Sequence, residues 1–273
     1  MCEVSRATGG SLRTEETEMG SSGGRAVLSD QDKERYHRHM MIAGWGQEGQ
    51  EKVKAARVFV AGAGGLGSPT AMYLAVAGVG HLTICDCDSP ELSNLNRQIL
   101  HNDSRIGVNK AESGKRTLGE LNPAIEVEAI TTRIEAENVD ELVGEADIIV
   151  DCMDNFPTRY VLNECAIRKG IPLVHASVWG LEGKLTFIHV PETACLRCVF
   201  PTPPPQEVFP VLGATPGMIG CLEAMEALKY LTGVGDTLKG RLLLWDGMDM
   251  EFASYPLKKD PKCPSCGGER AGG

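Results

Sequence analysis

Short apolar runs alternate with longer segments of helical period along most of the chain from Arg57 onward. A short apolar run predicts a buried strand, whereas apolar positions that recur about every 3.6 residues predict a helix. The predicted strands are RVFVAGA, HLTICDCD, IEVEAITT, ADIIVDCMD and IPLVHASV, and the helices between them are GLGSPTAMYLAVAG, VNKAESGKRTLGELN, AENVDELVGE and PTRYVLNECAIRKG. This alternation predicts a doubly wound, Rossmann-like α/β fold with a mainly parallel sheet.

Segments at both ends of the chain depart from this alternation. GKLTFIHV and RLLLWDGMDMEFASYPL add strands without intervening long helices, so the late part of the sheet is predicted to be mixed. The proline-rich PTPPPQEVFP predicts an extended loop. Near the start, SDQD at Ser29 offers a helix cap before the helical segment KERYHRHM. Residues 1–26 lack a hydrophobic period and predict a disordered tail, which leaves one domain over residues 27–273.

Composition narrows the class of protein. The 273 residues are 42% hydrophobic and 23% charged, as in ordinary globular proteins. A net charge of −10 and a pI near 5.2 argue against a nucleic-acid partner. The sequence contains no apolar run of the ~18 residues that a membrane span requires, and no secretory segment follows the N-terminus. Ten cysteines without such a segment indicate thiols and metal ligands, and we expect a cytoplasmic location.

A glycine-rich turn, GAGGLG, follows the first predicted strand and opens the first helix of the sheet region. Its glycines, Gly62, Gly64, Gly65 and Gly67, would let backbone amides approach a phosphate at the helix N-terminus. Asp86 ends the next predicted strand, where a carboxylate can accept hydrogen bonds from ribose hydroxyls. The motif indicates nucleotide binding rather than a merely tight turn, but it does not choose between NAD and ATP.

A polar hexapeptide beyond Asp86 favours ATP. Its residues are Ser93, Asn94, Leu95, Asn96, Arg97 and Gln98. A dehydrogenase has little use for an arginine here, whereas attack at the α-phosphorus of a triphosphate requires several donors around the phosphates. Arg97 supplies a permanently charged planar fork, Asn94 and Gln98 supply neutral donors, and Lys110 adds a point charge.

The segment DCMDN, residues 151–155, ends another predicted strand at the carboxyl edge of the sheet. Asp154 is a candidate ligand for a magnesium ion that bridges the phosphates, with Asn155 beside it. The alternative is that Asp154 caps the helix that follows, because Asp and Asn are both good cap residues.

Two CxxC pairs, Cys195–Cys198 and Cys263–Cys266, have the spacing of thiolate zinc knuckles. Four thiolates would leave no open coordination position, so we expect a structural zinc ion that pins the C-terminal extension to the core. Most remaining cysteines are interpreted as buried apolar residues; Cys221, early in a predicted helix, is interpreted as packing rather than as a nucleophile.

With these motifs in order, the chain resembles the MoeB/ThiF/HesA family, the bacterial relatives of ubiquitin-activating enzymes. The resemblance rests on RYHRHM, VFVAGAGGLGS, AGVGHLTICDCDSPELSNLNRQILH, VNKAES, DCMDN and the CxxC pairs. It implies an ATP-dependent adenylyltransferase. The substrate would be the C-terminal glycine carboxylate of a ubiquitin-like sulfur carrier of the MoaD/ThiS type, converted to an acyl-adenylate with release of pyrophosphate.

The resemblance also implies a role for each motif. It assigns Asp86 to the ribose, residues 93–97 and Lys110 to the phosphates, and Asp154 to magnesium or to transition-state alignment. Arg38 resembles the arginine that reaches into the ATP site of a neighbouring protomer, which implies a homodimer with two shared sites. From the residues alone, Arg38 would be a surface charge.

The loop VFPTPPPQEVFPVLGATPG departs from the family pattern, because many relatives carry a cysteine there that bonds the carrier. We therefore expect adenylation without a covalent thioester in this loop. No rhodanese-like segment follows the second CxxC pair, so the sulfur is expected from a separate donor, a cysteine desulfurase or a sulfurtransferase.

Two other functions stay open at this point. One is an NAD-dependent oxidoreductase built on the same glycine turn, and the other is a non-catalytic carrier-binding subunit. The motifs do not distinguish among carriers for molybdopterin, thiamine, cysteine or another sulfur pathway.

Overall fold

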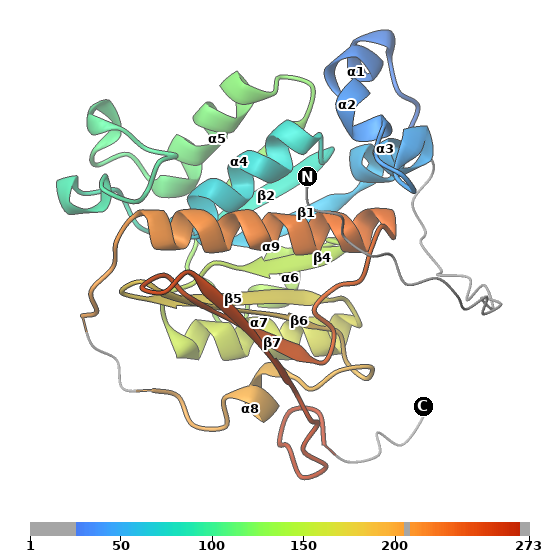
Figure 1. The fold of residues 1–273 in the computed structure, drawn as a ribbon. Coiled ribbons are helices and arrows are strands. Elements are labelled where there is room, and N and C mark those ends of the chain that lie inside the picture. The colour runs from blue at the N-terminus through green and yellow to red at the C-terminus, as the bar shows by residue number, and fades with distance from the viewer. Residues whose placement is uncertain (1–25, 205–207, 268–273) are drawn as a thin grey trace, which may run out of the picture.

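The computed structural model describes residues 26–204 and 208–267. The predicted tail, residues 1–26, lies outside these ranges except for Ala26. Within the described residues, one eight-stranded sheet runs through the molecule in the order β3-β2-β1-β4-β5-β6-β7-β8 (Figure 1). The strands are β1 Arg57–Ala61, β2 His81–Cys85, β3 Glu126–Ile130, β4 Ile148–Asp151, β5 Leu173–Trp179, β6 Glu182–Ile188, β7 Arg241–Asp246 and β8 Glu251–Pro256.

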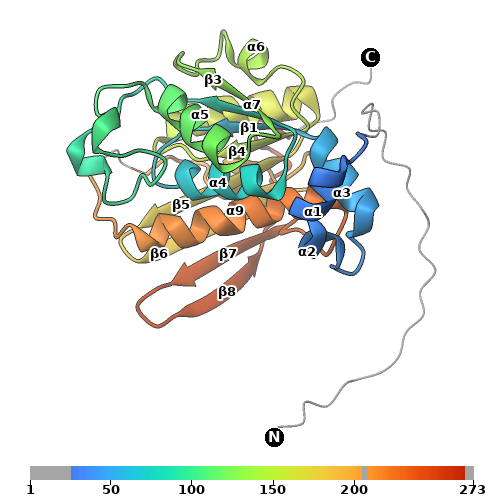
Figure 2. The same cartoon turned by 90° about the horizontal axis from the view of Figure 1, so that it is seen from above.

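Helices cover both faces of this sheet. On one face lie α3, α4, α5 and α9, and on the other lie α6, α7 and α8 (Figures 1 and 2). The α-helices are α1 Asp30–Arg35, α2 His37–Met40, α3 Gly46–Ala55, α4 Gly67–Ala77, α5 Lys110–Leu121, α6 Val139–Val143, α7 Phe156–Lys169, α8 Leu196–Val199 and α9 Ala214–Thr232. Two single-turn 3₁₀ helices, Leu92–Asn94 and Asp103–Arg105, lie between β2 and α5.

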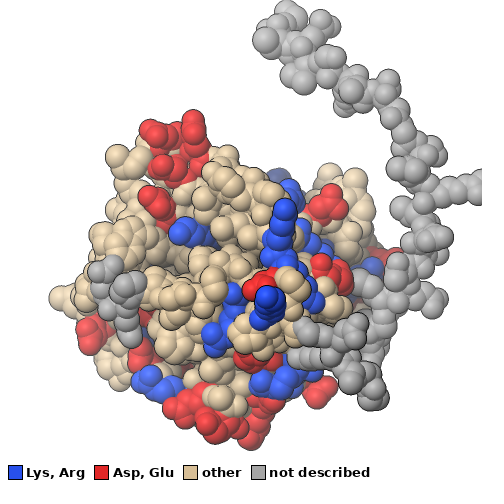
Figure 3. All heavy atoms as spheres, turned by 90° about the horizontal axis from the view of Figure 1, so that it is seen from below, with Lys and Arg blue, Asp and Glu red and all other residues tan. Residues whose placement is uncertain are grey.

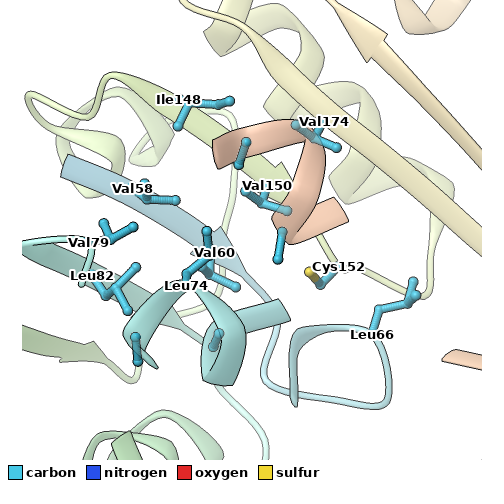
Figure 4. Close-up of a cluster of buried hydrophobic side chains, with 14 of the residues drawn as sticks. Val58, Val60, Leu66, Leu74, Val79, Leu82, Ile148, Val150, Cys152 and Val174 are labelled. Carbon is cyan, nitrogen blue, oxygen red and sulfur yellow. The ribbon is translucent and has the colours of Figure 1, made fainter. Parts of the chain in front are cut away.

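The central strand β1 is buried on both faces, which explains its nearly continuous apolar sequence. Val58 and Val60 pack with Leu74 of α4 and Val150 of β4 in one core (Figure 4). Phe59 and Ala61, whose side chains point to the other face of β1, pack in a second core beneath α6 and α7. The sheet therefore separates two hydrophobic cores, and each face of a central strand contributes to one of them.

Strands β1 to β5 pair in parallel, and β6, β7 and β8 pair antiparallel, so the predicted mainly parallel sheet with mixed late strands is confirmed. Strand β1 lies between β2 and β4, and the strand order reverses there. In such sheets ligands bind outside the carboxyl ends of the strands at the reversal point. The carboxyl ends of β1, β2 and β4 meet at Ala61, Cys85 and Asp151.

Some local predictions need correction. The expectation that no long helix separates the late strands is wrong, because α9 lies between β6 and β7. The single helix expected over KERYHRHM is interrupted at Tyr36, whose buried hydroxyl accepts a hydrogen bond from Asn122 Nδ2 at 2.8 Å. Helix α3 was not predicted, because GQEGQEKVKA has little apolar period. Its buried Gln50 donates to the carbonyl of Ala77 at 2.8 Å, a contact that only the folded chain supplies.

A buried carboxyl group lies where α9 crosses α4. The hydroxyl of Thr70 lies 3.0 Å from the carbonyl of Gly220 and 3.1 Å from Glu223 Oε2. Glu223 is fully buried, and its Oε1 has no hydrogen-bond partner among the described residues. Burial raises the pKa of Glu223 well above its ordinary value, and the nearby carboxylate of Asp151 adds to that rise. Glu223 therefore enters the core in its neutral form.

This neutral state predicts how stability depends on pH. Above about pH 4.5 the unfolded chain releases the Glu223 proton while the folded chain keeps it, so stability falls as pH rises. The slope reaches at most about 1.4 kcal/mol per pH unit. Glu223→Gln stays neutral in both states, so its free energy of unfolding relative to wild type should increase between pH 5 and pH 8 in urea titrations. The exposed control Glu137→Gln should show little change in this stability difference between pH 5 and pH 8. If the difference for Glu223→Gln is equally independent of pH, Glu223 is not neutral in the folded protein.

Candidate functional site

The glycine turn passes between β1 and α4 with no room for a side chain at Gly62 or Gly67. Gly62 has a φ of +99°, and a Cβ there would lie 2.8 Å from the carbonyl oxygen of Cys152. A Cβ on Gly67 would lie 1.9 Å from the carbonyl oxygen of Gly62. Helix α4 then begins at Gly67 without a side-chain cap. Ser68 N donates to the carbonyl of Gly64 at 3.0 Å, whereas no side chain caps the amide of Gly67, so an anionic ligand could accept from it.

Asp86 lies directly after β2 and holds the turn from one side. Its Oδ2 accepts a hydrogen bond from Ala63 N at 2.8 Å, and its Oδ1 accepts one from Asp88 N at 2.9 Å. Burial raises the pKa of Asp86, while the Ala63 amide and the Lys110 ammonium oppose that rise. The predicted ribose ligand therefore also orients the phosphate-binding turn.

His101 holds the same turn from the other side, and sequence analysis missed it. Its Nε2 lies 2.9 Å from the carbonyl oxygen of Ala63, and its Nδ1 lies 2.9 Å from Ser113 Oγ. Burial lowers the pKa of His101, which favours the neutral ring. A lone histidine in the segment QILH carries no signal of this contact, because the partners are distant in sequence.

The hexapeptide 93–98 folds against the glycine turn. Arg97 Nη1 donates to the carbonyl of Ser93 and to Asn96 Oδ1, both at 3.0 Å. A Cβ on Gly64 would lie 3.6 Å from Gln98 Nε2, and one on Gly65 would lie 3.5 Å from Arg97 Cδ. The structure therefore brings Arg97 and Gln98 to the turn, as the phosphate-site prediction requires.

The start of α9 completes this arrangement, and sequence analysis did not place it there. A Cβ on Gly213 would lie 2.2 Å from the carbonyl oxygen of Asn96. The ring of Pro216 lies 3.3 Å from the position that a Cβ on Gly65 would occupy. Three segments that are far apart in the sequence thus form one wall, namely the turn, the hexapeptide and the N-terminal turn of α9.

Lys110 approaches from the start of α5. Its amide donates to the carbonyl of Asp88 at 2.8 Å, and its Nζ lies 3.8 Å from Asp88 Oδ2. The side chain of the preceding residue, Asn109, caps α5 and donates to the carbonyl of Asp86 at 2.9 Å. Lys110 is only 8% exposed, so its ammonium group is held beside Asp88 with little freedom.

Asp154 is exposed, two residues beyond the buried Cys152, at the carboxyl edge of β4. The helix cap is Asn155, whose Oδ1 accepts from Thr158 N at 3.0 Å, so the alternative that Asp154 caps α7 is wrong. Asn155 Nδ2 donates to Asp154 Oδ1 at 3.3 Å. Asp154 forms no ion pair with any residue that the structure describes. A free carboxylate at this edge is a hard oxygen donor of the kind that Mg²⁺ takes.

Arg38, by contrast, is not brought to these residues. It is exposed on α2 and makes no hydrogen bond or ion pair within the described ranges. Helix α9 shows how far away it lies: Gly213 contacts Asn96 at its start, and Val234 contacts Gly44 beyond its end. Nineteen helical residues span about 28 Å, so the two ends of α9 lie far apart (Figure 2).

The four predicted zinc ligands form one cluster on the opposite side of the molecule, beside α8. Their sulfur atoms all lie within 4.8 Å of one another, with 3.5 Å between Cys195 and Cys263 and 3.4 Å between Cys198 and Cys266. Four thiolates at Zn–S distances of about 2.3 Å would be spaced similarly, so the cluster is compatible with zinc. Figure 3 shows that basic and acidic side chains are interspersed on the surface below it.

Cys221 lies within α9, two turns from its start, and is partly buried. Burial raises the pKa of its thiol, which disfavours the thiolate that a nucleophile requires. This direction of the pKa agrees with its interpretation as a packing residue.

Comparison with known proteins identifies relatives along nearly the whole chain. The ThiF family matches residues 36–265. The SAMP-activating enzyme E1 of Haloferax volcanii is 45% identical over 240 residues, which cover 86% of this chain and 88% of that protein. The sulfur carrier protein adenylyltransferase of Thermus thermophilus is 41% identical over 250 residues, covering 88% and 92%. The mouse adenylyltransferase and sulfurtransferase MOCS3 is 42% identical over 250 residues, covering 89% of this chain and 54% of that protein.

Solved structures share the fold at lower identity. Crystal structures of E. coli MccB with succinimide and with ATP have TM-scores of 0.77 and 0.74. They are 25% and 24% identical, and the matches cover 86% and 85% of this chain and 74% and 73% of theirs.

Among the described residues, no helix is long and apolar enough to cross a membrane.

Proposed function

The chain belongs to the ThiF family, and from this premise we propose that it activates the C-terminal glycine carboxylate of a small ubiquitin-like sulfur carrier. Relatives that align over most of their length are named as an activating enzyme and as a sulfur carrier adenylyltransferase. The observation that carries the proposal is that Arg97 lies against the glycine turn and Lys110 lies beside Asp88, because a dinucleotide-binding turn alone does not require either cation. Neither an oxidoreductase nor a non-catalytic subunit is favoured by these relatives.

The reaction would begin when the turn and α4 bind the ATP phosphates and Asp86 binds the ribose. A carboxylate oxygen of the carrier attacks the α-phosphorus, an acyl–phosphate bond forms, and the bond to the β-phosphate bridging oxygen breaks. Pyrophosphate leaves with the additional negative charge. Arg97 and Lys110 stabilise that charge as it develops, which lowers the barrier in the transition state.

Asp154 is the proposed magnesium ligand of this site. Magnesium, when bound, neutralises phosphate charge and orients the reacting groups. In this chain, Asn155 holds one oxygen of the Asp154 carboxylate, and the other oxygen is free for the ion. Asn155 therefore has two roles: it orients the Asp154 carboxylate, and it caps α7.

The acyl-adenylate would then pass to a separate partner. No cysteine lies between Cys198 and Cys221, the segment that would have to supply a thioester with the carrier. We therefore infer that the adenylate reacts with an external sulfur donor, such as a cysteine desulfurase or a sulfurtransferase.

We also infer a homodimer with shared sites. Within one chain Arg38 lies about one full length of α9 from the hexapeptide, so it cannot serve that site. It is an exposed arginine without a described partner, on a surface that also exposes Met41 and Ile42. An isologous contact would place Arg38 of each protomer at the phosphate site of the other.

A structural zinc ion is the proposed occupant of the cysteine cluster. The cluster joins α8 to the segment after β8, and Ser265 and Arg197 both contact Glu164 of α7. Four thiolates leave no position for a substrate, so the ion would contribute stability.

The adenylation site predicts a loss of turnover without a loss of fold. Arg97→Ala and Asp154→Ala should each lower carrier-dependent pyrophosphate–ATP exchange by about 10²–10³-fold, because each removes a charge that acts in the transition state. Thermal melting should change little, because both side chains lie at the surface of the site. Arg168→Ala removes an exposed arginine of α7 that pairs with Asp140 of α6, and this variant should exchange like wild type. Substantial exchange by either site variant would show that the site is misplaced.

Shared sites predict complementation. Arg38→Ala and Asp154→Ala should each be inactive alone, whereas co-expressed chains form dimers with one intact site. Random pairing would restore about a quarter of wild-type exchange activity. Sedimentation should report a dimer for wild type. A monomer, or mixed chains as inactive as their parents, would rule out sharing.

The zinc proposal predicts about one zinc ion per chain by elemental analysis, lost in Cys266→Ser. Loss of the ion should lower the melting temperature, because metal binding is coupled to folding of the C-terminal segment. The exposed Cys87→Ser should keep its zinc. Metal-free wild type with the same melting temperature as the metal-loaded protein would contradict a structural role.

A further inference from the structure

A buried polar network lies directly behind Asp154, and no step above uses it. It consists of Asp151 at the end of β4, Arg159 on α7 and His175 on β5. Asp151 Oδ2 lies 2.7 Å from His175 Nδ1 and 3.8 Å from Arg159 Nε. Asp151 and His175 are fully buried, and Arg159 is 5% exposed. Such a network requires a reason, because burying charges has a large desolvation cost.

The network holds Met153, the residue before Asp154, by both its carbonyl and its amide. Arg159 Nη2 donates to the carbonyl of Met153 at 2.5 Å, and Met153 N donates to Asp151 Oδ1 at 3.1 Å. The Met153 carbonyl belongs to the same planar peptide as the Asp154 amide, so fixing it also fixes the start of Asp154. The exposed Asp154 carboxylate has one described hydrogen bond, from Asn155 Nδ2, so the position of its backbone also decides where it points.

The guanidinium is itself held in place. Arg159 Nη2 also donates to the carbonyl of Ala176 at 3.1 Å, and the guanidinium carbon lies 5.1 Å from the ring centroid of Phe156. It therefore connects the Met153 carbonyl to β5 in the sheet. Lysine could not reproduce these contacts, because its single ammonium lacks the planar fork.

Packing alone does not account for this arginine. A hydrophobic side chain of similar volume often replaces a buried ion pair at no cost in stability or with a gain. What an apolar residue cannot supply is a donor for the Met153 carbonyl. The arginine is thus specific to the geometry of the 153–154 peptide.

We propose that Arg159 is a positioning residue that aims the Asp154 carboxylate at the metal–phosphate group. This inference rests on the proposed function, because it takes Asp154 as the magnesium ligand. Partners that orient a metal ligand typically affect metal affinity about 10–100-fold. Removing Arg159 should therefore weaken metal binding while leaving nucleotide binding by the glycine turn in place.

The test measures metal binding rather than turnover. Wild type, Arg159→Lys and Arg159→Met are saturated with a non-hydrolysable ATP analogue, and Mn²⁺ binding to each complex is measured by electron paramagnetic resonance. Metal-free affinity for the analogue should match wild type within about twofold, whereas the Mn²⁺ dissociation constant should rise about 10-fold or more in both variants. Arg168→Ala on the same helix is the matched control and should bind Mn²⁺ like wild type.

A double substitution separates positioning from general damage. In the Asp154→Asn background, Arg159→Lys should cause no further loss of Mn²⁺ affinity, because both changes act on the same ligand. An additive loss, or wild-type Mn²⁺ affinity in a variant that still binds the analogue, would overturn the proposal. If Arg159→Met does not fold, the lysine variant and this double substitution decide the question.

Failure of the proposed function would appear differently. Wild type that shows no carrier-dependent pyrophosphate exchange, yet loses Mn²⁺ affinity on Arg159 substitution, would refute the adenylation proposal and keep the positioning role. Wild type whose complex with the analogue binds no Mn²⁺ would overturn the positioning role itself.

Discussion

The structure depends on one close approach, the passage of the glycine turn beside the carboxyl end of β4. The missing Cβ of Gly62 would meet the Cys152 carbonyl, and that of Gly67 would meet Gly62 itself. Because the turn is this tight, α4 begins at the reversal point of the sheet, and it begins without a side-chain cap. The hexapeptide then packs against Gly64 and Gly65 of the same turn, and Pro216 of α9 packs against Gly65, so a side chain at Gly65 would press on both segments.

A layer of neutral and charged polar groups supports that wall from behind and from its sides. His101 and Asp86 fix Ala63 from its carbonyl and amide sides, and Asn109 connects the start of α5 to Asp86. Arg159 supports the β4 edge in the same way through Met153. His101 and Arg159 are buried, Asp86 and Asn109 are partly buried, and all four are hydrogen-bonded. Side chains held in this way are preorganised, which is what electrostatic catalysis at the proposed site would require.

Each of the two cores supports a different candidate site. The core beneath α4 and α9 supports the nucleotide side, and the core beneath α6 and α7 includes Cys195 of the zinc-compatible cluster. The length of α9 separates the hexapeptide from the N-terminal helices. For this reason Arg38 lies far from the proposed phosphate site of its own chain. A partner protomer would supply that arginine in the proposed dimer.

The sequence by itself determined the strand and helix order, the glycine turn with Asp86, and the two CxxC pairs, because these signals are local in spacing or period. It left open whether Asp154 is a magnesium ligand or the cap of α7, and it missed α3, whose buried Gln50 makes polar contacts. Only the tertiary structure decided that Gly213 closes on Asn96, that His101 holds Ala63, and that Arg159 fixes the peptide before Asp154. The physical reason is that these contacts join groups whose meeting depends on how helices pack on the sheet, and no spacing along the chain encodes that packing.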